Sequence, residues 1–308
     1  MKTLFIYLCI AGSALAVGGG AGVIIKREFT EPDRDYSNFD VSIYDVNPTE
    51  YIDKVEKYSS KDLAFSALTP VETAIYALEK YKTCENSFSF GYGVTTAPVV
   101  TQAIRNAQVK NGNSYFEESL SSSSMVSVGN RYVQLGGKDT DVDLYIADKS
   151  TVVISSNESK TGCNYPSKTK SFTFDKFIES YGKQPSEVFN YIVHPLSVKE
   201  SEKIKEEDGT YTINLEMYPD IATYKYQFQM KMISDLTSRP AFSREHLTIK
   251  LDNDLMLKQI IVDENYSASM FGISASLTAH ITYEYHPNEY MKIPEMNEKF
   301  DYTIGGTR

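Results

Sequence analysis

The chain has 308 residues, enough for one large β domain or two ordinary domains with apolar cores of their own. Its 31 Lys plus Arg against 41 Asp plus Glu give a net charge of -10, which argues against a nucleic acid partner. Tyrosine occurs 23 times and tryptophan is absent, a composition that suits amphipathic strands with ring-bearing apolar faces.

The N-terminal segment from Thr3 to Ile25 carries no charge. At about 1.5 Å per residue, a helix of this length crosses a hydrocarbon layer of roughly 30 Å. Lys2, the apolar run and the triplet Ala14 to Ala16 also fit a cleaved signal peptide, but the run continues past that triplet. We therefore predict an uncleaved single-pass membrane anchor in residues 1–28, with the signal peptide as the alternative.

Beyond that segment only two cysteines remain, Cys84 and Cys163. Their spacing matches no metal motif, so no metal or other cofactor is expected from them. They are a candidate disulfide in an extracytoplasmic setting, and two buried free thiols are the alternative. The predicted location is the cell membrane, with the main domain outside the cytoplasm.

Two helices are predicted before the first strands. Residues 29–65 form a charged, tyrosine-bearing spacer with one short helix that begins after Asn47. A second helix begins near Thr69, which can cap it together with Glu72, and Pro70 takes the first helical position. Val71, Ile75, Leu78 and Tyr81 recur at helical spacing and predict one buried stripe.

From Ser87 the apolar period changes to two, and closely spaced turn signals predict antiparallel strands. The segments "FTFDKFIESYG" and "QPSEVFNYIVHPL" interrupt them, with apolar side chains at helical spacing. These are Phe174, Phe177, Ile178, Val188, Tyr191 and Ile192. A second group of strands follows.

Two stretches in this second group alternate with a strand period. In "TYKYQFQMKM", residues 223–232, the side chains of Tyr224, Tyr226, Phe228 and Met230 fall on one face of the predicted strand. In residues 273–286 the apolar face runs from Ile273 through Ala275, Leu277, Ala279, Ile281 and Tyr283 to Tyr285. Long antiparallel strands twist and curl, so the predicted fold class is α+β, a curled antiparallel sheet or half-open β-barrel with a few covering helices.

The order of elements over residues 66–288 resembles the LolA/LolB superfamily of lipoprotein carriers, and the LppX-like lipoproteins in particular. The quoted helical interruption and the closing strands "LTIKLDNDLMLKQIIVDENYSASMFGISASLTAHITYEY" carry this resemblance. It implies a half-barrel in which helices form a lid over a bound acyl chain, in a bacterial protein. The lipid-modified cysteine of those lipoproteins is replaced by the predicted anchor, and no individual family residue transfers to this chain.

We therefore expect a non-catalytic protein that binds a lipid or another hydrophobic small molecule. The expected lining is Tyr224, Tyr226, Phe228, Met230, Leu277, Ile281 and Tyr283. The same residues could instead form a sealed core, in which case a surface or envelope-sensor module that binds another protein is the alternative. No catalytic motif is present, and His280, Glu284 and His286 fit a solvated strand face. The tail, residues 289–308, is expected to fray or lie along the surface.

Overall fold

The computed structural model describes residues 40–97, 100–125, 138–148, 151–160, 163–164, 168–173, 175–176, 189–233, 238–270 and 273–294. The helical elements are η1 (Val41–Tyr44), α2 (Pro48–Glu56), α3 (Lys61–Ala67), α4 (Pro70–Thr83), α6 (Pro219–Ala222) and α7 (Tyr224–Ile233). The strands are β1 (Asn86–Ala97), β2 (Val100–Asn111), β3 (Ser114–Met125), β4 (Lys138–Asp148), β5 (Thr151–Lys160), β6 (Cys163–Asn164), β7 (Lys168–Thr173), β8 (Val198–Lys205), β9 (Tyr211–Met217), β10 (Ala241–Leu251), β11 (Leu257–Met270) and β12 (Ile273–Pro287).

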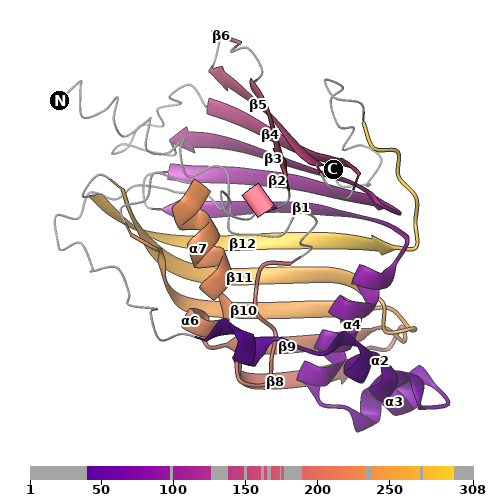
Figure 1. Cartoon of the computed structure of the whole chain (residues 1–308). Coiled ribbons are helices and arrows are strands. Elements are labelled where there is room, and N and C mark those ends of the chain that lie inside the picture. The colour runs from indigo at the N-terminus through magenta and orange to yellow at the C-terminus, as the bar shows by residue number, and fades with distance from the viewer. Residues whose placement is uncertain are drawn as a thin grey trace.

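All these strands belong to one antiparallel, 12-stranded sheet (Figure 1). The strand order is β6-β5-β4-β3-β2-β1-β12-β11-β10-β9-β8, and β7 pairs with β5. Two runs of sequential hairpins, β1 to β6 and β8 to β12, are thus joined where β1 pairs with β12. Among the described strands β8 pairs with β9 alone, so the sheet ends there and is not closed.

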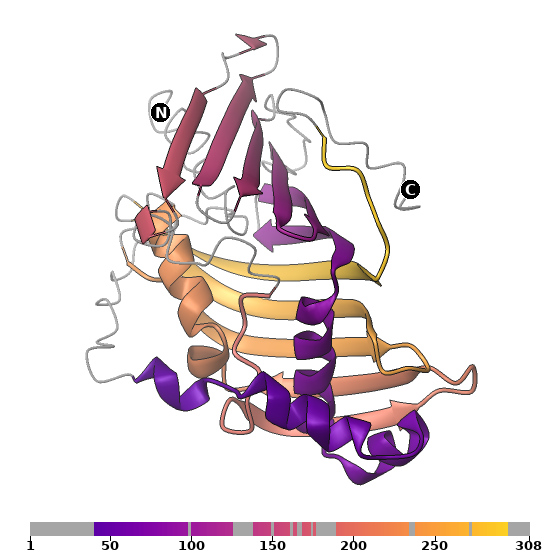
Figure 2. The same cartoon turned by 45° about the vertical axis from the view of Figure 1, so that its right-hand side comes forward.

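Helices α4 and α7 lie on the concave side of the curved sheet (Figure 2). Thr69 caps α4 through a reciprocal capping box with Glu72, and the predicted stripe of Val71, Ile75, Leu78 and Tyr81 is buried. The α+β prediction of a large, curved antiparallel sheet with few helices is therefore confirmed. The spacer contains more structure than predicted, since η1 and α3 accompany α2.

The main apolar core fills the concave side over β9 to β12. The inward residues Ala275, Leu277, Ala279, Ile281 and Tyr285 of β12 belong to it, which confirms the predicted face of this strand. A second, smaller cluster lies on the convex side, where Met291 of the C-terminal segment packs on aromatic side chains of β1 and β3. The segment 288–294 therefore lies along the surface, while residues 295–308 are outside the described part of the chain.

Residues 224–233 form helix α7, so the prediction of a strand over residues 223–232 is wrong. The same sequence also places buried side chains at helical steps, namely Thr223, Tyr226, Gln227 and Met230. The residues spaced by two in the sequence therefore separate onto different sides of the helix. Alternation over ten residues does not distinguish the two structures when the apolar positions also lie four residues apart.

Two further predictions need correction. Residues 189–193 form an irregular segment, so Tyr191 and Ile192 are not helical, whereas residues 177–188 are outside the described ranges. Cys84 is a free, buried thiol at the end of α4, and the candidate disulfide with Cys163 is not formed. Cys163 lies in β6, and four strands of the sheet separate β6 from β1, the strand that begins just after Cys84.

The predicted anchor, Thr3 to Ile25, lies in residues 1–39, outside the described part of the chain. Within the described ranges, none of the helices has the length and apolar character required to span a membrane.

Gly91 is needed where β1, β2 and β12 meet on the concave face. A Cβ atom at this position would lie 1.9 Å from Oδ1 of Asn106 and 2.8 Å from Cδ1 of Tyr283. We expect Gly91→Ala to lower the free energy of unfolding by about 1–3 kcal/mol, because side chains must shift to admit the methyl group. Denaturant unfolding measures this loss.

The matched comparison is the same substitution in an Asn106→Ala background. There the methyl group has the space of the truncated side chain, so Gly91→Ala should cost less than in the wild type. An equal cost in both backgrounds would show that the crowding by Asn106 does not determine the choice of glycine.

Candidate functional site

Two carboxyl groups face each other in the middle of the main core. Glu245 of β10 and Glu264 of β11 are directly paired in the antiparallel ladder, so their side chains leave the sheet on the same side. Their exposed fractions are 0% and 1%. Fully buried glutamates are rare unless they are paired, so this carboxyl pair is the most unusual chemical feature of the core.

A register shift in the sheet places Phe242 on the same side as Glu245. The pairing of β10 with β11 shifts between Phe242 and Arg244, as in a β-bulge. Phe242 is opposite Tyr266 and Glu245 is opposite Glu264, so all four side chains lie on the concave side. Without the extra residue, Phe242 and Glu245 would point to opposite faces.

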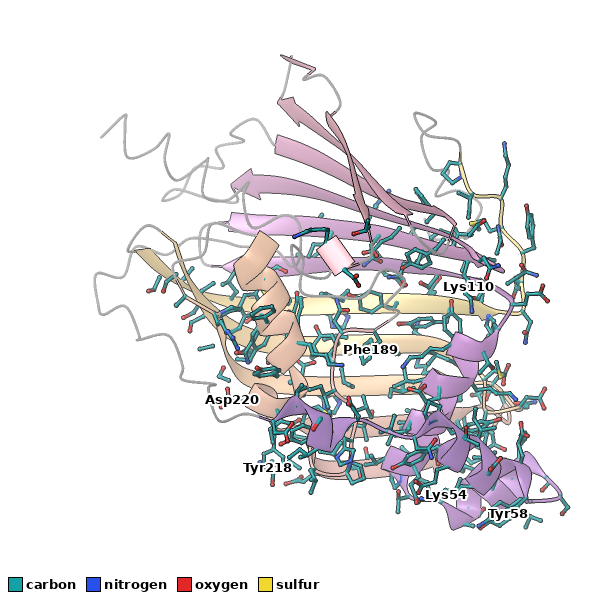
Figure 3. The ribbon with its side chains drawn as sticks, viewed as in Figure 1. Lys54, Tyr58, Lys110, Phe189, Tyr218 and Asp220 are labelled. Atoms are coloured by element: carbon teal, nitrogen blue, oxygen red, sulfur yellow. The ribbon has the colours of Figure 1, made fainter. Side chains whose placement is uncertain are left out.

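Helix α7 and the irregular segment 189–193 close the site above the sheet. The Tyr191 hydroxyl donates a hydrogen bond to Oε2 of Glu264 over 2.8 Å. The Ile192 amide donates to the Ala222 carbonyl oxygen over 2.8 Å, which holds the segment against α6. Phe189 begins this segment and lies on the concave side between α7 and α4 (Figure 3).

Aromatic rings form a continuous wall around the two carboxyl groups. Ring centroids lie 5.4 Å apart for Tyr191 and Tyr226, 5.7 Å for Tyr226 and Phe242, and 4.9 Å for Phe242 and Tyr266. Each contact is within the range of favourable ring packing. The wall excludes water from the carboxyl pair and gives it a low local polarity.

This environment raises the pKa of both carboxyl groups. Burial raises the pKa of Glu264 to about 7, although hydrogen bonds from Tyr191 and Glu245 oppose the shift. Burial and the charge of Glu264 raise the pKa of Glu245 well above its ordinary value. Near neutral pH the pair therefore retains at least one proton, on Glu245, which can donate it in a hydrogen bond to Glu264.

Apart from a proton shared within the pair, three of its carboxyl oxygens are buried and receive no donor from the other described residues. They are Oε1 and Oε2 of Glu245 and Oε1 of Glu264. A proton shared by the pair satisfies part of the hydrogen-bonding capacity of these oxygens but not all of it, because a carboxylate oxygen accepts more than one hydrogen bond. The arrangement can hold a proton or pair with a hydrogen-bond donor.

The structure brings together only part of the predicted lining. Tyr226 and Met230 on the inner side of α7 share the main core with Leu277 and Ile281 of β12. Tyr283 packs against this core. The side chains of Tyr226, Met230, Leu277 and Ile281 are buried there.

Two of the predicted lining residues lie elsewhere. Tyr224 and Phe228 are one helical turn apart, and the Arg239 guanidinium lies over both rings, at 5.4 Å and 5.0 Å from their centroids. Phe228 is 37% exposed. Neither ring belongs to the main core, so the structure does not bring them together with the other predicted lining residues.

A hollow of about 210 Å³ lies beside the C-terminal end of α4. It is lined by Tyr81, Lys82, Ser87, Gln108, Val109, Lys110 and Tyr115. The Lys110 ammonium donates to the carbonyl oxygens of Lys82 and Cys84 over 2.9 Å and 2.7 Å, and thus ties β2 to the end of α4 (Figure 3). Ser87 and Gln108 lie on the concave face, since they neighbour the inward side of β12 in the register.

A larger hollow of about 1030 Å³ lies on the other face, and its lining is mainly polar and charged. Lys250, Lys258 and Glu284 contribute to it. On the same face His280 is exposed and paired with Asp263 over 2.6 Å. Within the described part of the chain, no three His, Cys, Asp or Glu side chains come together as in a metal site.

Sequence reasoning missed the carboxyl pair, although a signal was present. Glu264 occupies the apolar side of β11, where Ile260 and Val262 precede it and Tyr266 follows. An acidic residue at a core position of an alternating strand is the pattern that would have identified it. Glu245 precedes Leu247 and Ile249 at the same two-residue step.

The described part of the chain is thus an open antiparallel sheet with helices on its concave side. No family model and no curated protein matches the chain.

Solved structures similar to this chain include a DUF1329 family protein from Desulfovibrio piger, with 11% identity over 76% of this chain and 97% of that one, and a TM-score of 0.25. A porin-like protein from Bacteroides uniformis has 12% identity over 66% of this chain and 98% of that one, with a TM-score of 0.20. The attachment invasion locus protein Ail of Yersinia pestis has 6% identity over 65% of this chain and 96% of that one, with a TM-score of 0.16. With TM-scores this low, none of the three assigns this chain to a fold family.

The raised pKa of Glu264 predicts a specific dependence of stability on pH. Because the folded protein binds this proton more tightly than the unfolded chain, the stabilisation is complete below the ordinary pKa of 4.5 and is lost as the pH rises to about 7. The expected loss is on the order of 3 kcal/mol. Glu264→Gln should remove it, so the wild type gains stability relative to the variant as the pH falls from 7 to 4.5.

Chemical denaturation at several pH values measures this difference. Glu284→Gln, which removes a carboxyl group from the convex face of the same sheet, is the control and should leave the pH dependence unchanged. Parallel curves for the wild type and Glu264→Gln would contradict the raised pKa.

Proposed function

We propose that this protein is a non-catalytic binding protein for a lipid or another hydrophobic small molecule, held on the concave side of a half-open barrel. In this proposal residues 3–25 anchor the chain to a membrane and the sheet domain lies outside the cytoplasm. The apolar chain of the ligand lies over β1 to β3, beside the main core.

The row of small side chains on the concave face of β1 carries the proposal. The side chains of Ser87, Ser89 and Thr95 alternate with Phe88, Phe90 and Val94, and glycines occupy the two inward positions between them, Gly91 and Gly93. Among the described residues, the main core includes no side chain from β1 to β5. The apolar face of β12 is thus adjacent to a strand that has no bulky side chains on its concave face.

The edges of this strip have the chemistry of an amphiphile site. Ile281 and Tyr283 of β12 supply an apolar and aromatic wall on one side. Asn106 and Gln108 of β2 are half-buried on the other side and supply polar groups. The hollow of about 210 Å³ beside Gln108 continues the strip toward α4. A ligand with an apolar chain and a polar group at one end fits a surface that changes from apolar to polar in this way.

A single tryptophan can test the position of the ligand, because the chain has none of its own. In the full chain, Gln108→Trp places the fluorophore on the concave face, and Lys258→Trp places it at the hollow on the convex face. Bromine atoms quench tryptophan at short range. A neutral monoacylglycerol with a dibrominated acyl chain should therefore quench the fluorescence of Gln108→Trp, with saturation.

Lys258→Trp is the matched control and should show only weak, non-saturating quenching by the same lipid. Equal quenching of both variants, or of neither, would refute a concave site. Absence of quenching in a variant with a normal far-ultraviolet circular dichroism spectrum would favour a protein partner over a hydrophobic ligand.

A further inference from the structure

We infer that the polar end of the ligand is an organic ammonium group, which the carboxyl groups of Glu245 and Glu264 receive under α7. This inference rests on the proposed function and specifies the class of ligand: an amphiphile with an alkyl chain and an amine. Three features of the carboxyl pair favour such a group: its unfilled acceptors, its surrounding charges and its aromatic wall.

The unfilled acceptors match the donors of an ammonium group. Apart from a proton shared within the pair, both carboxyl oxygens of Glu245 and Oε1 of Glu264 are buried without a donor among the other described residues, while Oε2 of Glu264 accepts from Tyr191. A primary ammonium group carries three N–H donors. Hydrogen bonds between such a group and a carboxylate are short and about twice as strong as neutral ones.

The charged and titratable groups that act on the pair favour a cation. On the concave side these are phenols from three elements: Tyr191 of the segment 189–193, Tyr226 of α7, and Tyr283 of β12. Tyr266 of β11 also interacts with Glu264. From the convex side, Asp263 of β11 and Glu216 of β9 add negative charge. Among the described residues, the groups that shift the pKa of either glutamate include no Lys, Arg or His side chain.

The aromatic wall supplies the second element of ammonium recognition. The rings of Tyr191, Tyr226, Phe242 and Tyr266 are packed in sequence around the carboxyl pair. Ring faces attract cations, and the attraction is stronger where water is excluded. Carboxylates enclosed by aromatic rings select a cation with apolar substituents over a strongly hydrated metal ion.

Tyr283 connects the carboxyl pair with the proposed acyl strip. It lies on β12 opposite Gly91 of β1, and its side chain contacts Asn106 of β2. The charges of Glu264 and Glu245 act on the same hydroxyl group and raise its pKa, together with burial. A ligand whose chain lies over β1 can therefore extend its amine past Tyr283 toward the pair.

A set of ligands that differ only in the end group tests this inference. The full chain is first saturated with the neutral fluorescent probe N-phenyl-1-naphthylamine, which is then displaced at pH 7.5 by dodecylamine or by dodecan-1-ol. Dodecylamine should displace the probe at a concentration about tenfold lower than dodecan-1-ol. Glu264→Gln and, separately, Glu245→Gln should reduce this preference to less than about threefold, without a change for dodecan-1-ol.

Glu284→Gln is the matched control, since it removes a carboxyl group of the same sheet from the convex face, and it should retain the preference. Equal displacement by the two ligands would overturn the ammonium inference and leave the hydrophobic site intact. Displacement by neither ligand would overturn both. A preference for the amine that persists in both glutamine variants would place the cation elsewhere and overturn the assignment to this pair.

Discussion

Two carboxyl groups that face each other across one strand pair are buried in the concave interior, and the structure around them must compensate for their lost hydration. Removing a carboxylate from water is costly unless protons or donors compensate for it. The Tyr191 hydroxyl, 2.8 Å from Glu264, supplies one donor, and it is positioned by a segment that is itself bonded to α6. The site, the irregular segment and the helices above it are therefore energetically connected.

The two sides of the sheet's concave surface differ because their inward side chains differ. From β9 to β12 the inward positions are large and apolar, and α4 and α7 pack on them. On β1 the inward positions are serine, threonine and glycine, and Ser87, Ser89 and Thr95 are buried although the main core includes none of them.

Elements could be predicted from the sequence where the capping residues and the apolar period agree with the burial that the fold imposes. The capping box of Thr69 and Glu72 and the alternation along β12 are examples, because propensity, capping and burial all indicate the same structure. The sequence of α7 fits both the two-residue period of a strand and the spacing of a helix, and it was predicted as a strand. Tertiary contacts decide between the two structures. The alternation of each strand shows Glu245 and Glu264 at core positions, but their opposition depends on the pairing register of β10 with β11, which neither strand shows alone. The irregular course of Tyr191 likewise follows from its long-range bond to Glu264.

The pairing of β1 with β12 also has a consequence for how the chain folds. It joins the first and the last of the described strands in the sequence, while most other neighbours in the sheet are sequential hairpins. Helix α4 precedes all of the described strands, yet its buried stripe packs in the core over β9 to β12. During synthesis this helix is completed well before its partners exist. Contacts so distant in sequence slow folding, so the apolar stripe of α4 stays exposed until the last hairpins form.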